Sequence, residues 1–322
     1  MSLWPGLLLT AVIAAAAFLP RAMTGWAMLN PLVVAILLGI ALRAAIGLPT
    51  AAAAGLTVSQ KRVLRIAIAL LGLQISMSQI AEIGWSGAVI ALSCLAATFM
   101  FIKALGRLLG VESQLATLIA AGTSICGASA IAAVNSATRA PEEDAAYAIA
   151  CITLFGTAAM LLYPLIAALL PLSAHGYGLW SGATLHELGQ AVAAAFQQGD
   201  AAGQTGTVAK LLRVAMLPAM VLLLALRMRG KTAAGTSPAA MPWFVLGFIA
   251  LMIVGNVIDV PASLKGRAND LAIFLLCMGL AAMGFATDLT KVRAKGLRPL
   301  LLAGLGTLFI SSLGLALAFW LA

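Results

Sequence analysis

The segment from Ala120 to Val134 reads AAGTSICGASAIAAV and places a few polar groups among small residues, with apolar sequence on both sides. Backbone amides in lipid cannot turn to water, so such an interruption survives only where protein or a wet cavity surrounds it. Transporters build substrate sites in this way, with a helix broken near the bilayer midplane and freed N–H groups and hydroxyls facing the ligand. The alternative is one continuous, tightly packed helix, because small residues also let two helices approach closely. On the first interpretation, the residues predicted to bind substrate are Thr123, Ser124, Ile125, Cys126, Gly127 and Ser129.

Two basic residues, Lys210 and Arg213, lie in VAKLLRVAML and share one face of a helix because they are three positions apart. A charge inside a membrane span is costly, so each is a site hypothesis by default. A guanidinium can bind a tetrahedral or planar oxyanion through two parallel hydrogen bonds. We therefore predict that Arg213, together with Lys210, binds an anionic substrate. The alternative is an ion pair between Arg213 and Glu187.

A third group of polar residues, His186, Glu187 and Gln190, lies in LHELGQAVAAA. A buried carboxylate has its pKa raised, and a histidine titrates near neutral pH. This pattern predicts a coupling or gating role, with His186 and Glu187 carrying protons or a cation. The alternative is that the pair satisfies each other or a helix end near the cytoplasmic mouth.

The same residues argue against an enzyme. The zinc-protease motif HExxH needs a second histidine at the position where this chain has Gln190. An intramembrane hydrolase could use Cys126 or Ser124 as nucleophile and His186 as base, but a third group must orient that base. Glu187 follows His186 directly, so on a helix it would point about 100° away. The four cysteines lie in separate apolar runs without a CxxC pair. We expect no enzymatic activity, no cofactor and no metal site.

Composition indicates which elements hold these residues. Of the 322 residues, 63% are hydrophobic and 9% are charged, and the mean hydropathy is +1.08. A membrane-spanning helix needs about 20 apolar residues. The sequence divides into apolar segments of this length with short polar gaps. We predict an all-α polytopic membrane protein with about eleven transmembrane helices, surrounded by the lipid bilayer and without a sizeable soluble domain.

The basic residues lie mainly in the short gaps, and if the gaps alternate between two faces, most of them gather on one face. The positive-inside rule then predicts a cytoplasmic N-terminus and, with an odd number of spans, a C-terminus on the other side. The same placement accounts for the net charge of +9 without a nucleic-acid partner.

Two pairs of segments resemble each other within the chain. Residues 66–92 align with residues 278–304, and on the count of eleven spans they run in opposite directions, as an inverted repeat requires. Residues 123–134 (TSICGASAIAAV) align with residues 184–195 (TLHELGQAVAAA). These two run in the same direction on that count, so either the match is chance or one segment is re-entrant.

The first of these pairs favours internal symmetry. The predicted regions are an extra N-terminal transmembrane helix at 1–26 and two inverted five-helix repeats at 27–171 and 172–322. In this scheme, the partner of the Ala120–Val134 segment is the tenth apolar segment, whose Gly279 and Gly284 would permit a second break.

The piece GTSICGASAIAA, from Gly122 to Ala133, resembles the signature of the YeiH-type family of bacterial inner-membrane proteins, whose members are associated with sulfate export. Further pieces that are similar to this family are LLGLQIS from Leu70, AYAIACITLFGTAAMLLYPL from Ala146, HELGQAVAAA from His186 and KLLRVAMLP from Lys210. One departure is the pair Leu188 and Gly189, where valine and alanine are expected before the glutamine. It puts no ligand residue in doubt.

The resemblance implies a secondary transporter similar in outline to the bile-acid/sodium symporter superfamily, with two inverted five-helix repeats, crossed broken helices and a homodimer. It also implies the inner membrane, which makes the C-terminus periplasmic. We therefore expect alternating-access export of a small anion such as sulfate or a sulfonate, with coupling to H⁺ or Na⁺ left open. The alternatives are an anion channel, a cation-coupled symporter of another small organic acid and an intramembrane enzyme.

Overall fold

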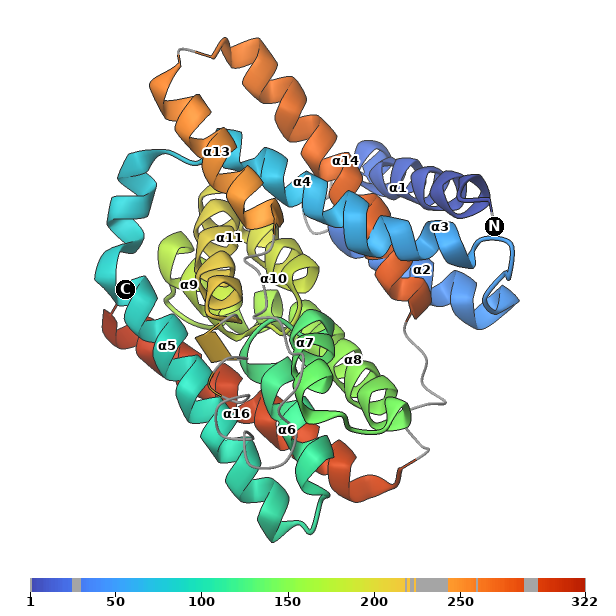
Figure 1. Cartoon of the computed structure of the whole chain (residues 1–322). Coiled ribbons are helices and arrows are strands. Elements are labelled where there is room, and N and C mark those ends of the chain that lie inside the picture. The colour runs from blue at the N-terminus through green and yellow to red at the C-terminus, as the bar shows by residue number, and fades with distance from the viewer. Residues whose placement is uncertain are drawn as a thin grey trace. The chain divides into compact units, whose positions relative to one another are not determined.

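The computed structural model shows helices and connecting segments, without β-strands, over the residues that it describes (Figure 1). These residues are 2–24, 30–217, 219–220, 223, 243–258, 260–286 and 295–321. Asp288, at the end of the tenth apolar segment, lies outside them.

Several of the described helices are suited to a membrane. Those long and apolar enough to cross one are Ile83–Leu108, Glu142–Ala167, Ala262–Ala286 and Leu297–Leu321. Shorter apolar helices are Trp4–Pro20, Pro31–Ile46 and Trp243–Val257. This composition agrees with the predicted all-α polytopic membrane protein. The count of about eleven spans and the inverted repeats remain predictions.

Two compact units divide the chain, and each combines separated parts of the sequence. The first contains Met1–Ala81 and Trp243–Thr287, and the second contains Glu82–Pro242 and Asp288–Ala322. Helix α5 (Met77–Leu108) begins in the first unit and continues in the second, and its backbone leaves helical geometry at Gly84 (φ 48°, ψ −148°). This φ lies in the region that favours glycine. The predicted boundaries at residues 26 and 171 concern internal symmetry, and they also stay predictions.

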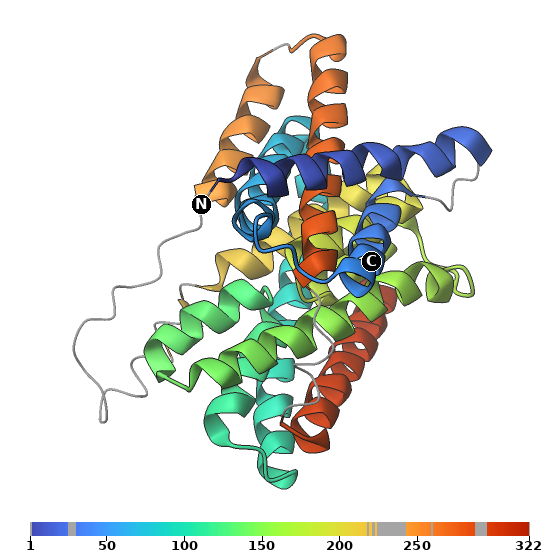
Figure 2. The same cartoon turned by 90° about the vertical axis from the view of Figure 1, so that its right-hand side faces the viewer.

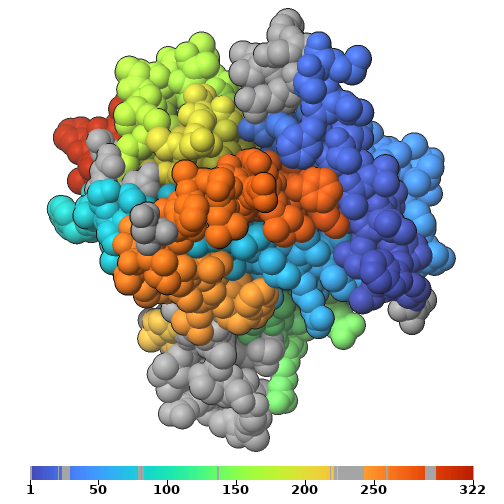
Figure 3. Space-filling view, turned by 90° about the horizontal axis from the view of Figure 1, so that it is seen from above, coloured from blue at the N-terminus to red at the C-terminus, as the bar shows by residue number. Residues whose placement is uncertain are grey.

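The first unit is organised around α14, which runs without interruption from Ala262 to Ala286. Its other described helices are α1 (Trp4–Thr24), α2 (Pro31–Ile46), α3 (Ala53–Val58), the π-helix η1 (Ser59–Val63), α4 (Leu64–Leu71), the 3₁₀-helix η2 (Gly72–Gln74) and α13 (Trp243–Val257). Helix α14 packs against α1, α2 and α4, and α1 runs across it (Figure 2). The surfaces of α1, α4, α13 and α14 share one face of this unit (Figure 3).

Glycines in α14 allow close packing and do not interrupt the helix. A Cβ atom on Gly284 would lie 2.4 Å from the carbonyl oxygen of Ile36 in α2, and one on Gly39 would lie 2.3 Å from the carbonyl oxygen of Ala281. Small residues thus let α2 and α14 approach backbone to backbone. The expectation of a second break at Gly279 or Gly284 is therefore wrong, because both glycines lie inside a continuous helix.

The second unit contains all of the residues predicted to form the site. Its described helices, besides most of α5, are α6 (Ser113–Ser124), α7 (Ala128–Thr138), α8 (Glu142–Ala167), α9 (Ala174–Thr184), α10 (Leu188–Ala195), the 3₁₀-helix η3 (Phe196–Gln198), α11 (Asp200–Ala215) and α16 (Leu297–Leu321). Helix α11 packs along both α9 and α10, and α16 packs against α6, α8 and α9.

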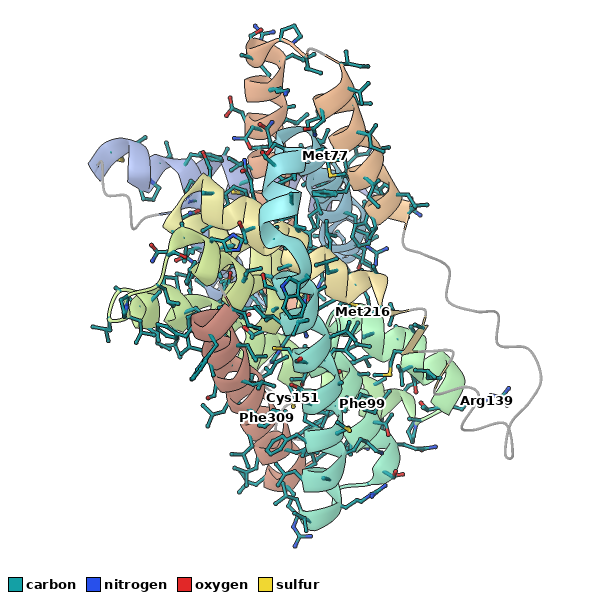
Figure 4. All side chains as sticks on the ribbon, turned by 90° about the vertical axis from the view of Figure 1, so that its left-hand side faces the viewer. Met77, Phe99, Arg139, Cys151, Met216 and Phe309 are labelled. Carbon is teal, nitrogen blue, oxygen red and sulfur yellow. The ribbon has the colours of Figure 1, made fainter. Side chains whose placement is uncertain are left out.

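Aromatic residues hold α16 in place. The rings of Tyr163 in α8 and Trp180 in α9 stack with 3.9 Å between their centroids. The Tyr163 hydroxyl donates to Oγ of Ser311 (2.6 Å), and Nε1 of Trp180 donates to the carbonyl oxygen of Ser311 (2.9 Å). Phe309 of α16, which is labelled in Figure 4, stacks on Phe101 of α5 with 4.1 Å between the ring centroids. These contacts fix the frame in which α6 and α9 are interrupted.

Candidate substrate site at two helix breaks

The first break separates α6 from α7. Helix α6 ends at Ser124 and α7 begins at Ala128, and between them Ile125 (φ −116°, ψ −87°) and Gly127 (φ 66°, ψ −131°) leave helical geometry. Glycine is required at the second position, because a Cβ on Gly127 would have a strained φ and would lie 2.5 Å from Cγ of Glu187. The predicted break is confirmed, and the alternative of a continuous helix is wrong.

The second break separates α9 from α10. Helix α9 ends at Thr184 and α10 begins at Leu188, with Leu185 (φ −61°, ψ 148°) and Glu187 (φ −98°, ψ 151°) in extended conformation. This break was not predicted. The signal for it was present in the alignment of residues 123–134 with 184–195, which places the two breaks at nearly the same position.

Lys210 joins the two breaks. Its Nζ donates to the carbonyl oxygens of Ile125 (2.9 Å), Leu185 (2.6 Å) and His186 (2.6 Å), and its side chain is fully buried. The carbonyl groups at a helix C-terminus have no partner within the helix, and they carry the negative end of the helix dipole. The ammonium group therefore satisfies carbonyl oxygens that neither water nor lipid could satisfy.

Arg213 does the same one turn further along α11. Its Nε donates to the carbonyl oxygen of Ser124 (3.1 Å), its Nη2 to that of Thr123 (2.8 Å) and its Nη1 to that of Leu185 (2.9 Å). The side chain is 0% exposed. Leu185, which the sequence did not single out, thus accepts hydrogen bonds from both basic residues through its backbone.

The packing of α11 on α9 brings these side chains to the breaks. A Cβ on Gly182 of α9 would lie 2.3 Å from the carbonyl oxygen of Gly206 in α11, and one on Gly178 would lie 2.6 Å from that of Ala202. The glycines let the two backbones touch. Residues three positions apart on α11 then face the two C-terminal helix ends together.

Glu187 precedes α10 in the chain, and its side chain reaches across to the start of α7. The carboxyl group packs against Gly127, the residue that precedes α7, and accepts a 3.4 Å hydrogen bond from Oγ1 of Thr153. A carboxylate at this end of a helix is stabilised by the positive end of the dipole. Within the described part of the chain, neither Lys210 nor Arg213 forms an ion pair with Glu187.

Gln190 caps the start of α10. Its Oε1 accepts from the backbone N–H of Glu187 (3.1 Å), and its Nε2 donates to the carbonyl oxygen of Thr153 and to Oγ1 of Thr157 (both 3.2 Å). A Cβ on Gly156 would lie 2.1 Å from Oε1, so glycine makes room for this amide. Gln190 therefore connects the second break to α8.

His186 contacts α16. Its Nε2 lies 2.8 Å from Oγ1 of Thr307, and that hydroxyl donates its single proton to the carbonyl oxygen of Ala303 (2.8 Å). The histidine must then donate through Nε2–H, which leaves Nδ1 as an acceptor in the neutral ring. This Nδ1 and Oγ1 of Thr123 are both buried, and neither has a hydrogen-bond partner.

The remaining predicted residues are divided between interior and surface. Ser124 and Cys126 are buried, and the Ser124 hydroxyl donates back to the carbonyl oxygen of Ala120 (2.6 Å). Ser129, in the first turn of α7, is exposed. The structure thus brings the two breaks, the two basic residues and the His186–Gln190 segment together, with Ser129 at their edge.

Comparison with known proteins places the chain in a family. The family described as "Conserved hypothetical protein 698" matches residues 5–303. The chain belongs to this family. It is also the family that the YeiH-type motifs indicated. A relative from Listeria monocytogenes, named as a UPF0324 membrane protein, is 35% identical to this chain over 316 residues, which cover 98% of this chain and 94% of the relative. A UPF0324 membrane protein from Agrobacterium fabrum is 37% identical over 326 residues, which cover 98% of this chain and 92% of that relative. The names of these relatives agree with a membrane location and state no substrate.

Proposed function

We propose that this protein is a secondary transporter that exports a small anion, such as sulfate or a sulfonate, by alternating access around its two broken helices. The proposal combines the family membership, the apolar helices and the cluster at the breaks. The observation that carries it is the charge of that cluster.

Two cations and one carboxylate occupy the cluster. Lys210 and Arg213 are 0% exposed and Glu187 is 9% exposed, and among the described residues no other charged group contributes to these contacts. His186 donates through Nε2–H in the pattern given above and adds no negative charge. A buried charge is costly unless it is paired. The excess positive charge therefore favours a bound anion.

The helix breaks support the same ligand class and the same mechanism. The N-terminal ends of α7 and α10 present backbone N–H groups and the positive ends of their dipoles, which favour anions. Transporters with discontinuous helices place such ends at the substrate and move one part of the fold against another around them. An inside-negative potential assists the outward movement of an anion by about 2.3 kcal/mol per charge per 100 mV.

The test is flux in proteoliposomes that contain the purified protein. We expect saturable uptake of radiolabelled sulfate or a small sulfonate that is accelerated by unlabelled anion on the opposite side. Flux that neither saturates nor responds to the opposite side would favour the anion channel. Absence of flux for sulfate, sulfite, sulfonates and carboxylates would contradict the proposal. Chemical conversion of the anion would favour the enzyme.

A further inference from the structure

We infer that Lys210 and Arg213 stand in the place of a coupling metal cation, so that this protein holds its broken helices together and moves its substrate without Na⁺ or K⁺. The part about transport rests on the proposed function. The part about the helix breaks rests on the geometry alone.

The geometry of Lys210 is that of a bound cation. Its Nζ lies 2.6–2.9 Å from three carbonyl oxygens, one at the first break and two at the second. A neutral amine has too few N–H groups for three acceptors, so the group is an ammonium ion. The side chain thus delivers a positive charge to the point where the two breaks meet.

Broken-helix transporters use the same type of oxygen atom for a different purpose. In them, unwound backbone carbonyls and the C-terminal ends of half-helices coordinate Na⁺ or receive H⁺. In this protein, N–H groups bind the carbonyl oxygens of Ile125, Leu185 and His186, and Arg213 binds those of the α6 end. A metal ion at this point would also meet repulsion from two fixed positive charges.

Glu187 and His186 are the titratable groups of the second break that accompany this pair. Neither changes the inference, because the Glu187 carboxyl group packs against Gly127 and His186 is engaged with Thr307. Coupling to H⁺ through these two residues remains compatible with it. The inference concerns metal cations only.

A direct consequence follows for a variant without the ammonium group. Lys210→Met has a side chain that is one heavy atom shorter and carries no N–H donor. It leaves three carbonyl oxygens grouped around the position of the missing Nζ, and of these the one of Leu185 still accepts from Arg213. Oxygen–nitrogen distances of 2.6–2.9 Å match the size of NH₄⁺ or K⁺ better than that of the smaller Na⁺. The variant should therefore gain a dependence on a small monovalent cation that the natural protein lacks.

The experiment measures thermal unfolding of purified protein in choline, sodium, potassium and ammonium chloride at equal ionic strength. We expect the Tm of the natural protein to agree within about 1 °C in the four salts, and that of Lys210→Met to rise by about 3 °C or more in ammonium or potassium chloride over choline chloride. Lys265→Met is the matched control, since Lys265 also donates to a backbone carbonyl, that of Gly255 at 3.0 Å, but to one only. It should show no selective response.

The outcomes separate this inference from the proposed function. Stabilisation of the natural protein by Na⁺ or K⁺, or anion flux that stops when choline replaces these ions, would overturn the inference and leave anion transport standing. Absence of any flux would contradict the proposed function, while the unfolding data would still decide the question of the cation. If Lys210→Met does not fold in any salt, the natural protein supplies the deciding measurements, because both the unfolding and the flux comparison can be made on it alone.

Discussion

Gly284 in α14 and Gly127 between α6 and α7 lie in similar sequence, rich in small residues, yet the backbone treats them differently. At Gly284 the helix continues and α2 comes within backbone contact. At Gly127 the helix has ended, with φ at 66°. The difference lies in what surrounds the carbonyl groups: among the residues that the structure describes, buried basic side chains donate to the backbone at the second region and not at the first.

A glycine therefore permits a helix break in an apolar environment, and a donor on a neighbouring helix makes the break stable. Carbonyl groups released without a partner cost several kcal/mol each in lipid. In the second unit, the side chains of Lys210 and Arg213 bind those groups. In α14, the released carbonyls of a break would have to find equivalent donors, and the intact helix avoids that requirement.

The largest effect is expected for Arg213→Met. The change removes three hydrogen bonds from a charged donor and leaves the carbonyl oxygens of Thr123 and Ser124 buried without those partners, a loss of about 3 kcal/mol or more. Anion binding should be lost at every pH. The measurements are Tm and anion-dependent stabilisation, and the exposed Arg298→Met is the control that should behave like the natural protein. Normal stability and transport in Arg213→Met would mean that this side chain does not stabilise the helix breaks and does not bind the anion.

Gly39→Ala tests the other region. Its Cβ would lie 2.3 Å from the carbonyl oxygen of Ala281, which is backbone and cannot move aside, so α2 and α14 must separate. We expect a loss of about 1–3 kcal/mol in the free energy of unfolding. Gly266→Ala in the partner helix α14 is the control, since no atom lies within 4 Å of its Cβ. Equal effects in the two variants would mean that close packing does not explain these glycines.

Gly127→Ala should cost about 1–3 kcal/mol, because φ 66° with ψ −131° is a conformation that side chains rarely adopt. It should also displace the Glu187 side chain, whose Cγ would lie 2.5 Å from the new Cβ. We therefore expect transport to fall more than stability does, in contrast to Gly39→Ala. Parallel measurement of flux and Tm checks this. A variant that keeps its flux while losing stability would show that the position of Glu187 is unimportant.

The smallest effect on stability is expected for Glu187→Gln. The amide oxygen can still accept from Thr153, but the group no longer ionises. Anion binding should be retained, while the pH dependence of flux shifts or flattens. Flux measured across pH, beside the natural protein, provides the test. If Glu187→Gln loses anion binding and keeps the pH profile of the natural protein, Glu187 does not have the proposed role.

The sequence indicated one break and missed the other for a physical reason. The first break contains Gly127, whose need for a positive φ is visible as a glycine among small polar residues. The second break uses Leu185 and Glu187 in extended conformations that any residue can adopt, so residue type carries no signal there. Only the internal alignment marked it, and the assumption of alternating full spans argued against that alignment.

The partners of the basic residues were also beyond prediction from residue types. Lys210 and Arg213 were recognisable because charge within apolar sequence is rare. Their position on one face of a helix was also correctly inferred. Their partners are backbone carbonyl groups, which every residue possesses. Which carbonyls are released depends on where helices end, and this becomes known only from the fold.

The position of α11 in the chain has a consequence for biogenesis. Lys210 and Arg213 lie in the C-terminal half of α11. A lysine or an arginine at the centre of an inserting segment costs about 2.5–3.5 kcal/mol, and two such charges should make α11 enter a bilayer poorly by itself. The helix ends that bind its charges belong to α6 and α9, which are synthesised earlier. When α11 leaves the ribosome, its counterparts already exist, and we expect residues 200–217 to insert efficiently only in nascent chains that carry both earlier breaks, which glycosylation mapping of truncated chains would detect.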